Sequence, residues 1–177
     1  MFYTRKGDDG TTKTLKSNGR ILKCSDTIEA LGCVDEINSF LGLCKIKAEK
    51  ENLGIDEIVY DIQNNLFIIQ AELAGCDKTI TIDKVTKLEK VIDDLEKQIP
   101  PITHFILSGG SEISALFDIA RTLARKTERN VISAIIKEQV VISNDTKSYL
   151  NRLSSVLYAL ARFSNYKLGV LEIGPKY

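Results

Sequence analysis

Five stretches of this sequence repeat apolar residues at intervals of three and four, the spacing that places side chains on one face of an α-helix. The first begins at Ser25-Asp26, where Glu29 follows Asp26 by three residues in a capping-box pattern, and it runs to about Glu49. The other stretches run from about 56 to 75, from 85 to 99, from 111 onward, and from about 145 to 168. Long helices joined by short connections predict an all-α fold, an antiparallel bundle of four to five helices.

Outside these stretches the sequence shows little strand character. Only ITHFIL, residues 102–107, and TKTL near the N-terminus look extended. A chain of 177 residues is long enough to bury one core, and nothing in its composition indicates a second. We therefore expect a single domain over residues 1–177, with an N-terminal segment (1–24), a helical bundle (25–168) and a C-terminal tail (169–177).

The charge and cysteine content narrow the setting in which the chain works. Basic and acidic residues balance at 24 each, so no overall field attracts the chain to nucleic acid or to a membrane, and an anion site must be local. Four cysteines without a C-x-x-C pair and a single histidine favour free thiols over a disulfide framework or a zinc site. Residues 1–14 lack the apolar core of a signal peptide, and no run of about 18 apolar residues follows. These features predict a cytoplasmic protein.

Several common catalytic motifs are absent from the sequence. It contains no G-x-x-x-x-G-K-[ST], no G-x-G-x-x-G after a strand, no G-x-S-x-G and no H-E-x-x-H. A di-iron site in a bundle takes Glu-x-x-His pairs from facing helices, which one histidine cannot supply. Standard hydrolase, dinucleotide-binding and metalloenzyme chemistry is therefore disfavoured.

Basic and small polar residues gather in YTRKGDDGTTKT, residues 3–14. Glycines allow backbone N–H groups to approach an anion closely, threonines add short donors, and lysine and arginine supply charge to a polyphosphate. Asp8 and Asp9 offer oxygen ligands for a divalent cation. Composition alone leaves two interpretations open, a polyphosphate site and a charged N-terminus without a ligand.

Arg121, Arg125 and Arg129 follow one another at intervals of four in ARTLARKTERN and form a ridge on one face of a predicted helix. We call these three residues the arginine ridge. Like charges at this spacing destabilise a helix by about 0.2 to 0.5 kcal/mol per pair. Glu128 lies beside Arg121 and Arg125, where it can orient them. The cost of placing like charges together disappears if a carboxylate from another helix or a bound phosphate lies among the three arginines. The alternative is a solvated charged face.

Two other polar stretches supply candidate partners for the arginine ridge. CVDEINS, residues 33–39, offers Asp35 and Glu36, either of which could be the buried partner of an arginine. Asn151 in NRLSS can read an adenine edge or a phosphate through its amide, although a lone asparagine is more often a polar surface residue.

Taken in order, four motifs resemble the PduO-type ATP:cob(I)alamin adenosyltransferases. They are YTRKGDDGTT, EALGCVDEINS, FILSGG with ALFDIARTLARKTERN, and LNRLSSVLYALARFSN, so the likeness extends from Tyr3 to about Asn165. Each motif alone is weak, but four in the same order over nearly the whole chain are specific. The resemblance implies a helical bundle assembled as a homotrimer, with ATP at the junction of neighbouring subunits and the corrinoid beside it.

The resemblance also assigns roles to individual residues. Asp35 resembles the acid that pairs with Arg121 and orders the site, and Phe105 resembles the wedge that excludes the lower axial ligand of cobalt. The residues implied to wrap the triphosphate from the N-terminal segment are Thr4, Arg5, Lys6, Gly7, Thr12, Lys13 and Lys23. Those implied to complete the nucleotide site, from the adjacent subunit, are Arg125, Glu128, Arg129 and Asn151.

The implied reaction transfers the 5′-deoxyadenosyl group of ATP to Co(I) of cobalamin and releases triphosphate, with Mg²⁺ as the accompanying cation. Co(I) is a powerful nucleophile, which agrees with the missing serine, cysteine and histidine motifs. The reaction also implies an electron donor such as a flavin-type reductase and an adenosylcobalamin-dependent enzyme that receives the product. No nucleic acid or membrane partner is expected.

Three positions depart from the family pattern. Lys126 stands where the family commonly has a second consecutive arginine, Ser108 replaces a proline before Gly-Gly, and Ser155 replaces an acid after N-R-L-S. Lysine keeps the charge but loses bidentate geometry. These departures motivate an alternative function, a non-catalytic bundle that binds cobalamin or ATP and stores or delivers the cofactor.

Overall fold

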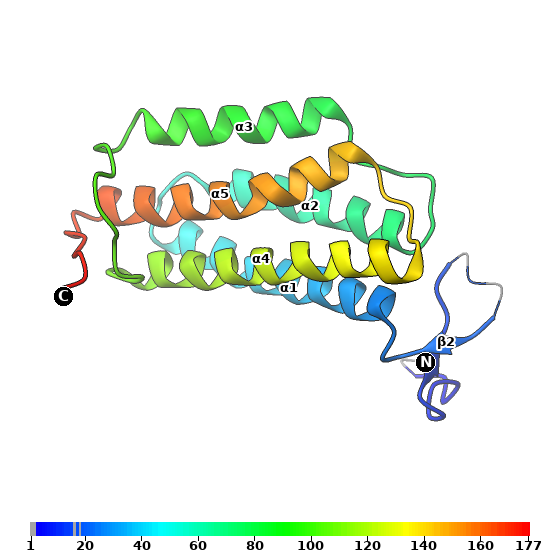
Figure 1. The fold of residues 1–177 in the computed structure, drawn as a ribbon. Helices are drawn as coiled ribbons and strands as arrows, with labels where there is room; N and C mark the ends of the chain where they lie inside the picture. Colours follow the sequence, from blue (N-terminus) through cyan, green and yellow to red (C-terminus); the bar gives the residue numbers. More distant parts are fainter. Residues whose placement is uncertain (1–2, 16, 18) are drawn as a thin grey trace.

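Five long helices make up most of the fold, as the apolar spacing predicts. The computed structural model describes residues 3–15, 17 and 19–177. Successive helices run in alternate directions along one axis (Figure 1), which confirms the all-α bundle of four to five helices. Their bounds are α1 Asp26–Lys50, α2 Asp56–Leu73, α3 Ile82–Glu96, α4 Glu112–Glu138 and α5 Asn144–Lys167.

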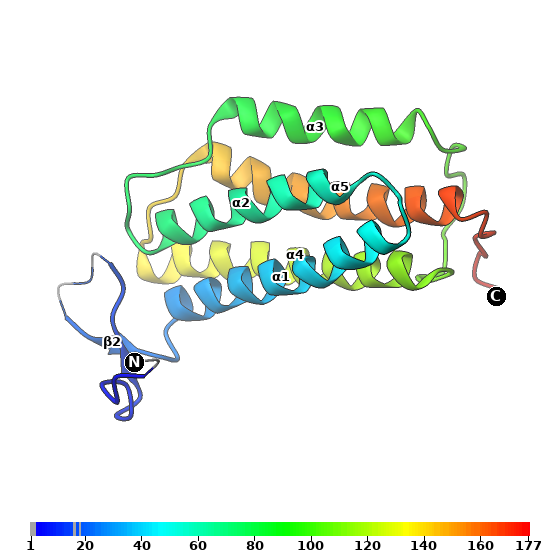
Figure 2. The same cartoon turned by 180° about the vertical axis from the view of Figure 1, so that it is seen from behind.

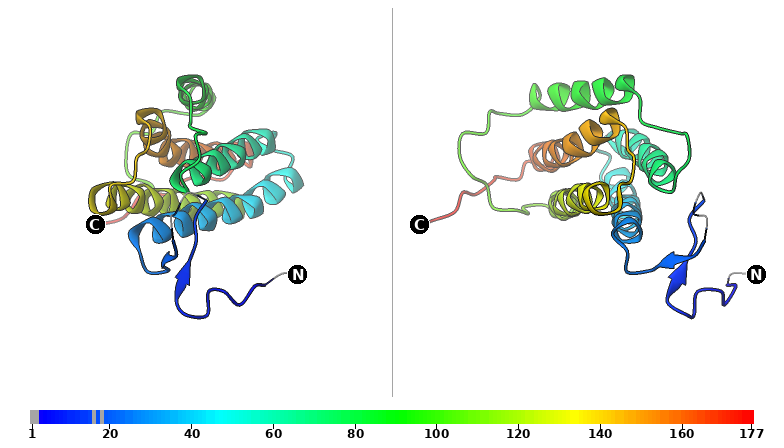
Figure 3. Two further views of the ribbon diagram at one scale, coloured as in Figure 1. Left: turned by 90° about the vertical axis from the view of Figure 1, so that its right-hand side faces the viewer. Right: turned by 45° about the vertical axis from the view of Figure 1, so that its right-hand side comes forward.

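The helices form a four-helix core with one outer helix. α1 packs against α2 and α4, and α4 packs against α5 (Figure 2). α3 lies over α5 and runs parallel to it, as the end-on view in Figure 3 and the side view in Figure 1 both show. The N-terminal segment projects from the start of α1, whereas the connection before α4 and the C-terminal tail lie at the opposite end of the bundle (Figure 1).

Serine residues cap three of the five helices. Ser25 accepts a hydrogen bond from the backbone N–H of Ile28 at 3.4 Å at the start of α1, and Ser111 and Ser143 do the same at the starts of α4 and α5. Such caps stabilise a helix by about 1 kcal/mol each. The capping box expected from Asp26 and Glu29 is wrong, because the cap lies one residue earlier and the Glu29 carboxylate accepts from the Cys33 thiol at 3.7 Å.

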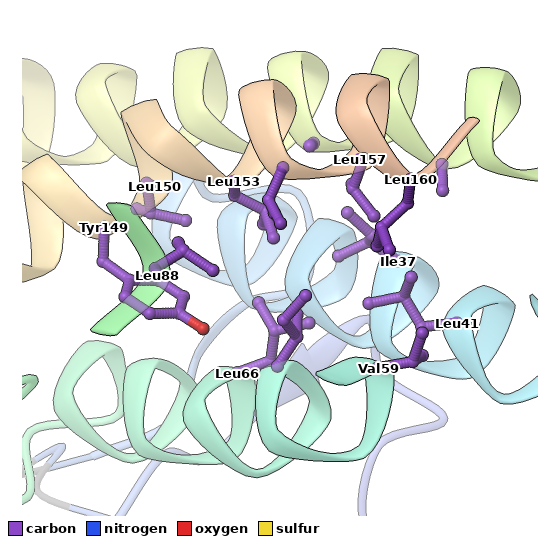
Figure 4. Close-up of a cluster of buried hydrophobic side chains, with 14 of the residues drawn as sticks. Ile37, Leu41, Val59, Leu66, Leu88, Tyr149, Leu150, Leu153, Leu157 and Leu160 are labelled. Carbon is purple, nitrogen blue, oxygen red and sulfur yellow. The ribbon is translucent and has the colours of Figure 1, made fainter. Parts of the chain in front are cut away.

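Apolar side chains from all five helices form one continuous core. Leucines of α5 meet side chains from α1 and α2 at its centre (Figure 4). Burying one such side chain contributes about 1.5 to 3 kcal/mol. Tyr149 is the largest fully buried side chain, and its hydroxyl accepts from the Asn65 amide at 3.1 Å, which in turn accepts from Lys84 of α3 at 2.7 Å.

Two short extended regions differ from the sequence-based expectation. β1 Thr11–Thr12 pairs in antiparallel fashion with β2 Ile21–Leu22, and two residues are too few to leave a detectable alternation of apolar and polar residues. Residues 102–107 form no strand, but the N–H of Leu107 donates to the carbonyl of Ile173 at 2.9 Å. That segment therefore lies along the C-terminal tail without forming a strand with it.

All four cysteines are free, as expected, and they differ in exposure. Burial raises the pKa of the Cys44 thiol to about 12, whereas Cys24 is exposed. We expect iodoacetamide to label Cys24 in the native protein at neutral pH and to label Cys44 only after denaturation, because the thiolate is the reactive species. Peptide mass spectrometry after timed labelling checks this order, and early labelling of Cys44 would contradict the packing described for α1.

Candidate functional site

Two members of the arginine ridge, Arg121 and Arg125, line a cavity on one side of the bundle. Arg121 and Arg125 of α4 face a space of about 350 Å³ that is closed by residues of α3, of α5 and of the connection before α4. Tyr158 and Ser155 of α5 line the same space. Arg125 and Arg129 are exposed, and neither makes an ion pair or hydrogen bond with any other described residue. Two guanidinium groups are thus available to an anion.

Arg121 pairs with an acid other than the one expected from the resemblance. Its Nε lies 3.7 Å from Oδ1 of Asp118, one turn earlier on α4, and this buried nitrogen has no hydrogen-bond partner among the described residues. Asp35 is exposed on α1 and accepts from Gln70 of α2 at 3.4 Å. Within one chain, Asp35 and Arg121 therefore do not meet, and their pairing stays a prediction that requires two chains.

A buried ion pair joins α4 and α5 near the cavity lined by Arg121. Arg162 of α5 is 2% exposed and Asp118 is 4% exposed, and their nearest atoms, Nη2 and Oδ2, lie 2.8 Å apart. The same Asp118 oxygen accepts from the N–H of Gly109 at 3.0 Å, and Arg162 Nε lies 3.1 Å from Glu172 of the C-terminal tail. One pair of charges thus connects α4, α5, the tail and the turn that follows Phe105.

Two glycines form that turn, and both require the left-handed half of backbone space. Gly109 has a φ of 109° and Gly110 a φ of 104°, which favour glycine because it has no Cβ. Asn165, fully buried at the end of α5, donates to the carbonyl of Gly109 at 2.8 Å and accepts from the N–H of Ser111 at 3.0 Å. The turn is held on both sides by one amide, which fixes where the preceding residues lie.

Replacing Gly110→Ala should destabilise the fold by about 1 to 3 kcal/mol, because a left-handed φ strains any residue with a Cβ. The added Cβ would also lie 2.8 Å from the Asn165 amide nitrogen. Chemical denaturation followed by circular dichroism measures the change. Gly32→Ala is the matched control, because Gly32 lies inside α1 with open space around its Cβ position. There alanine should raise the free energy of unfolding by about 1 kcal/mol. Equal effects would contradict the turn geometry.

Phe105 is an exposed side chain rather than part of the core. It is 80% exposed and lines a second cavity, of about 590 Å³, at the end of the bundle. His104 and Tyr158 also line this space, together with the end of the C-terminal tail. Ile102 and Tyr158 border both cavities, so the space beside Phe105 adjoins the space beside Arg125. An exposed phenylalanine whose cavity adjoins that of the unpaired Arg125 suits a site with one apolar and one anionic occupant.

A chain of polar contacts connects α4, through α5, to the outer helix α3. Asn151 of α5 donates to the Glu128 carboxylate at 2.9 Å and accepts from Arg152 at 2.6 Å. Arg152 Nε in turn donates to Glu89 of α3 at 3.0 Å. Glu128 and Asn151, both expected in the nucleotide site, are thus brought together, with the side chain of each held in a defined orientation.

The departures from the family pattern occupy different places. Lys126 pairs with Glu36 of α1 at 2.9 Å, so its charge is directed toward α1 and away from the cavity beside Arg125. Ser155 lines that cavity. Ser108 is exposed just before the Gly109 turn.

The N-terminal segment folds into a turn and a short hairpin. Lys23 Nζ donates to the carbonyl of Gly7 at 2.7 Å, and a Cβ on Gly7 would lie 3.1 Å from that nitrogen. Asp9 Oδ1 accepts from the N–H of Thr11 at 3.0 Å and from its hydroxyl at 2.6 Å, and these hydrogen bonds hold the pKa of Asp9 below its usual range. The remaining basic and hydroxyl residues expected at a triphosphate are exposed or half-buried on this segment: Thr4, Arg5, Lys6, Thr12 and Lys13.

The N-terminal segment and the connection between α3 and α4, which contains Phe105, lie at opposite ends of the bundle (Figure 1). The segment leaves α1 on the side away from α3 and α5, whereas the ridge cavity is lined by α3, α4 and α5 (Figure 3). A single chain therefore brings Phe105 close to Arg121 and Arg125 but does not bring the expected triphosphate residues to them.

Sequence reasoning missed three side chains that shape this region. Tyr158 lies at the border of both cavities, and its ring stacks 5.1 Å from the Arg162 guanidinium. Helical spacing alone could have indicated Tyr158, since it falls seven residues after Asn151 on the same helix face. Asp118 and Arg162 carry no such signal, because only the packing of α4 on α5 pairs them.

Comparison with known proteins points to one family. The sequence profile of the cobalamin adenosyltransferases matches residues 2–164. The corrinoid adenosyltransferase PduO of Citrobacter freundii is 36% identical over 172 residues, which are 93% of this chain and 50% of that protein. The corrinoid adenosyltransferase of Bacillus subtilis is 35% identical over 179 residues, 97% of this chain and 90% of that protein. The chain thus spans about half the length of the Citrobacter relative and most of the Bacillus one.

Solved structures agree over the whole chain. A variant of the PduO-type ATP:corrinoid adenosyltransferase from Lactobacillus reuteri, complexed with cobalamin and ATP, superposes with a TM-score of 0.93 at 26% identity and covers 99% of this chain and 97% of that one. A second variant, complexed with ATP, gives a TM-score of 0.90 at 28% identity over 98% and 99% of the two chains. The five helices and the N-terminal segment are therefore shared features.

Proposed function

The chain belongs to the cobalamin adenosyltransferase family, and from that premise we propose that it transfers the 5′-deoxyadenosyl group of ATP to Co(I) of cobalamin. Cobalt attacks C5′, a cobalt–carbon bond forms, and the C5′–O bond breaks with its electron pair leaving on triphosphate. Relatives named corrinoid adenosyltransferases and a structural neighbour complexed with both substrates support this. The observation that carries it is the adjoining pair of cavities, one beside the free Arg125 and one beside the exposed Phe105.

The arginine ridge is proposed to act on the nucleotide. Charge builds on triphosphate as the C5′–O bond breaks, and preorganised cations at that position lower the barrier. Arg125 and Arg129 have no competing partner among the described residues, so both are free to bind phosphate oxygens. Glu128, oriented by Asn151, lies three residues after Arg125 on α4, the spacing at which helical side chains are neighbours, and can direct the Arg125 guanidinium. No side chain has to act as a nucleophile, because cobalt itself is the nucleophile.

Phe105 is proposed to act on the corrinoid. Co(II) is easier to reduce to Co(I) when its lower axial nitrogen ligand is removed, since that donor raises the energy of the orbital that the electron enters. An exposed phenylalanine, four residues before a turn fixed by Asn165 and Asp118, can occupy the space of the ligand. Its apolar ring cannot replace the nitrogen as a donor.

Mg²⁺ is proposed to arrive with the triphosphate, where it would neutralise part of the charge. The described residues contain no cluster of three or more histidine, cysteine or acidic side chains that would form a metal cage. Mg²⁺ commonly keeps several waters and takes its other ligands from phosphates and one or two carboxylates, so this donor set fits. Asp9 is committed to Thr11 and Arg20, which leaves the exposed Asp8 as the available carboxylate of the N-terminal segment.

We propose that complete sites form between copies in a homotrimer. The N-terminal segment of one copy would supply Lys6, Lys13 and Lys23, and the ridge of the next copy would supply Arg125 and Arg129. The separation of these two groups within one chain supports this arrangement, as does the exposure of Asp35 away from Arg121. Exposed apolar side chains on α1 and α2, Leu43, Ile46, Tyr60 and Phe67, suit a subunit interface.

Mixing two inactive variants tests the shared site. Lys13→Ala damages one half of each site and Arg125→Ala the other, so after dissociation and reassembly together some sites combine two intact halves. Recovered activity in the mixture, and none in either variant reassembled alone, is the expected result. A mixture that stays inactive while forming trimers would contradict a site shared between copies.

Spectroscopic turnover tests the proposed reaction. Protein, ATP, Mg²⁺ and chemically reduced cobalamin are mixed, and the visible spectrum is followed for formation of the cobalt–carbon bond. Binding of ATP without any spectral change over hours, with active reductant present, would instead support the storage or delivery function. ATP that fails to raise the melting temperature would contradict both.

The proposed cellular compartment and partners follow from the free cysteines and from the needs of the proposed reaction. Four free cysteines fit a reducing compartment, and we place the enzyme in the cytoplasm. No helix within the described residues is long and apolar enough to cross a bilayer. The reaction needs an electron donor, for which a flavin-type reductase suits the chemistry, and an adenosylcobalamin-dependent enzyme would use the product.

A further inference from the structure

A large cavity lies at the end of the bundle that carries the N-terminal segment. It measures about 1090 Å³ and is lined by residues of that segment and by the loops after α2 and α4. Among the described residues no lysine or arginine lines it, so these residues offer no cation to a polyphosphate. Its walls contain three acidic residues that the proposed chemistry does not use: Glu72, Asp77 and Glu138.

Two of these carboxylates, those of Glu72 and Glu138, bind the first turn of a helix. Glu72 accepts from the N–H of Ser143 at 2.6 Å and from the Thr146 hydroxyl at the start of α5. Glu138, the last residue of α4, accepts from the N–H groups of two residues at the start of α1, Asp26 at 2.8 Å and Thr27 at 3.0 Å, and from the Thr27 hydroxyl. A carboxylate at a helix N-terminus satisfies free N–H groups and interacts favourably with the helix dipole.

The contact between α4 and α1 is reciprocal. Asp26, whose N–H binds Glu138, accepts through its own carboxylate from the Ser133 hydroxyl at 2.8 Å and from Lys137 at 2.9 Å. Five residues of α1 and α4 are thus joined through two carboxylates, one from each helix. We call Asp26, Thr27, Ser133, Lys137 and Glu138 the α1–α4 clasp.

The clasp lies directly after the N-terminal segment. Lys23 is three residues before Asp26, its N–H donates to the carbonyl of Gly10 at 2.9 Å, and its Nζ donates to Gly7. The N–H of Ser25 then donates to the carbonyl of Leu22 at 3.1 Å. The clasp therefore joins the residue where the segment leaves the bundle to the C-terminal end of the helix that carries the arginine ridge.

We infer that Glu138 is a positioning residue for ATP, which it never touches: through the first turn of α1 it fixes the N-terminal segment relative to α4. This inference rests on the proposed function. In a ring of identical copies, each chain contributes its N-terminal segment to one site and its arginine ridge to another. The segment and the ridge of one chain must therefore keep a fixed relative position for every site in the ring to be complete. Without the clasp the segment would still fold but would meet the triphosphate in many orientations.

Glu138→Gln tests the inference because the amide keeps the size of the side chain and removes its charge. We expect the KM for ATP to rise about tenfold, which corresponds to about 1.4 kcal/mol. We expect kcat and the KM for cobalamin to change less than about twofold. Trypsin should also cleave the N-terminal segment of the ATP-free variant several times faster than that of the wild type, at Lys6, Lys13 or Arg20.

Ser143→Ala is the matched control, because it removes the N-cap of α5 beside the same cavity without touching α1. It should lower the melting temperature and leave the KM for ATP and the trypsin cleavage unchanged. If both variants change KM in proportion to their loss of stability, Glu138 is only a structural cap and the inference is overturned. Thr27→Val, which removes one hydroxyl of the clasp, gives the same comparison should Glu138→Gln fail to fold.

The readouts separate this inference from the proposed reaction. If the wild type shows no turnover, the dissociation constant of ATP from calorimetry replaces KM, and cleavage by trypsin needs no activity at all. An active wild type with an unaltered Glu138→Gln variant overturns the clasp and leaves the reaction standing.

Discussion

Arg125→Ala should weaken ATP binding about 100-fold or more while leaving helicity and assembly intact. A charge-assisted hydrogen bond contributes about 1.5 to 3 kcal/mol, and a guanidinium can make two to one phosphate, so losing it removes at least two factors of ten. Arg125 is exposed and has no partner among the described residues, so its removal leaves no buried group without a hydrogen bond. Calorimetric titration with ATP gives the affinity, and circular dichroism checks the fold.

Lys126→Ala is the matched control for this prediction. It removes one positive charge from the neighbouring position of the same helix, but that charge is directed to Glu36 of α1. We expect its ATP affinity to fall less than about threefold, since this charge does not line the cavity beside Arg125 and charges exposed to solvent are screened by salt. Normal binding by Arg125→Ala would remove the arginine ridge from the site. Equal losses in the two variants would mean that only overall charge matters.

Phe105→Ala should slow turnover about 100-fold when the reaction starts from Co(II), and less than about fivefold when Co(I) is formed beforehand. The difference, about 1.7 kcal/mol of barrier or more, isolates the reduction step from the transfer step. Phe105 is 80% exposed, so truncating it leaves no cavity in the core, and stability should hardly change. Two assays differing only in the oxidation state of cobalt at the start measure the effect.

Leu107→Ala controls for loss of an exposed apolar side chain from the same segment. Leu107 contacts the tail through its backbone N–H and does not line the cavity beside Phe105. Its turnover from Co(II) should stay within about twofold of the wild type. Equal losses from Co(II) and Co(I) in Phe105→Ala would disprove the wedge role and leave Phe105 as a contact for the corrinoid.

The helices could be predicted because two independent signals coincide in them. An apolar side chain every three or four residues marks the buried face, and boundary residues such as Ser111, Gly75 and Pro100 mark the ends. The hairpin of β1 and β2 has neither signal, because its strands are two residues long and Arg20 bonds Thr11 across it. Local contacts of this kind depend on single side chains and leave no periodic trace.

In the candidate site, too, residues that share one helix could be predicted, whereas contacts between helices could not. The arginine ridge was predictable because its three members share one helix, so their spacing alone places them together. Asp118 was not, since its role depends on Arg162 of another helix and on the backbone of Gly109. Tyr158 lay within reach of the spacing argument, but one position on a helix face does not reveal that two cavities meet there. How the two ends of the bundle combine depends on contacts between chains, which helical spacing does not encode.

The buried pair of Asp118 and Arg162 limits how this protein can diverge. Replacing one of the two residues leaves the other charge buried without a partner and lowers the free energy of unfolding by about 3 to 5 kcal/mol. Exchanging both for apolar residues of similar volume is often tolerated. The first change to either position therefore passes through a poorly stable intermediate. Across descendants of this chain, the two positions should covary, surviving as a pair or disappearing as a pair, and where they disappear the turn after Phe105 must have found another anchor.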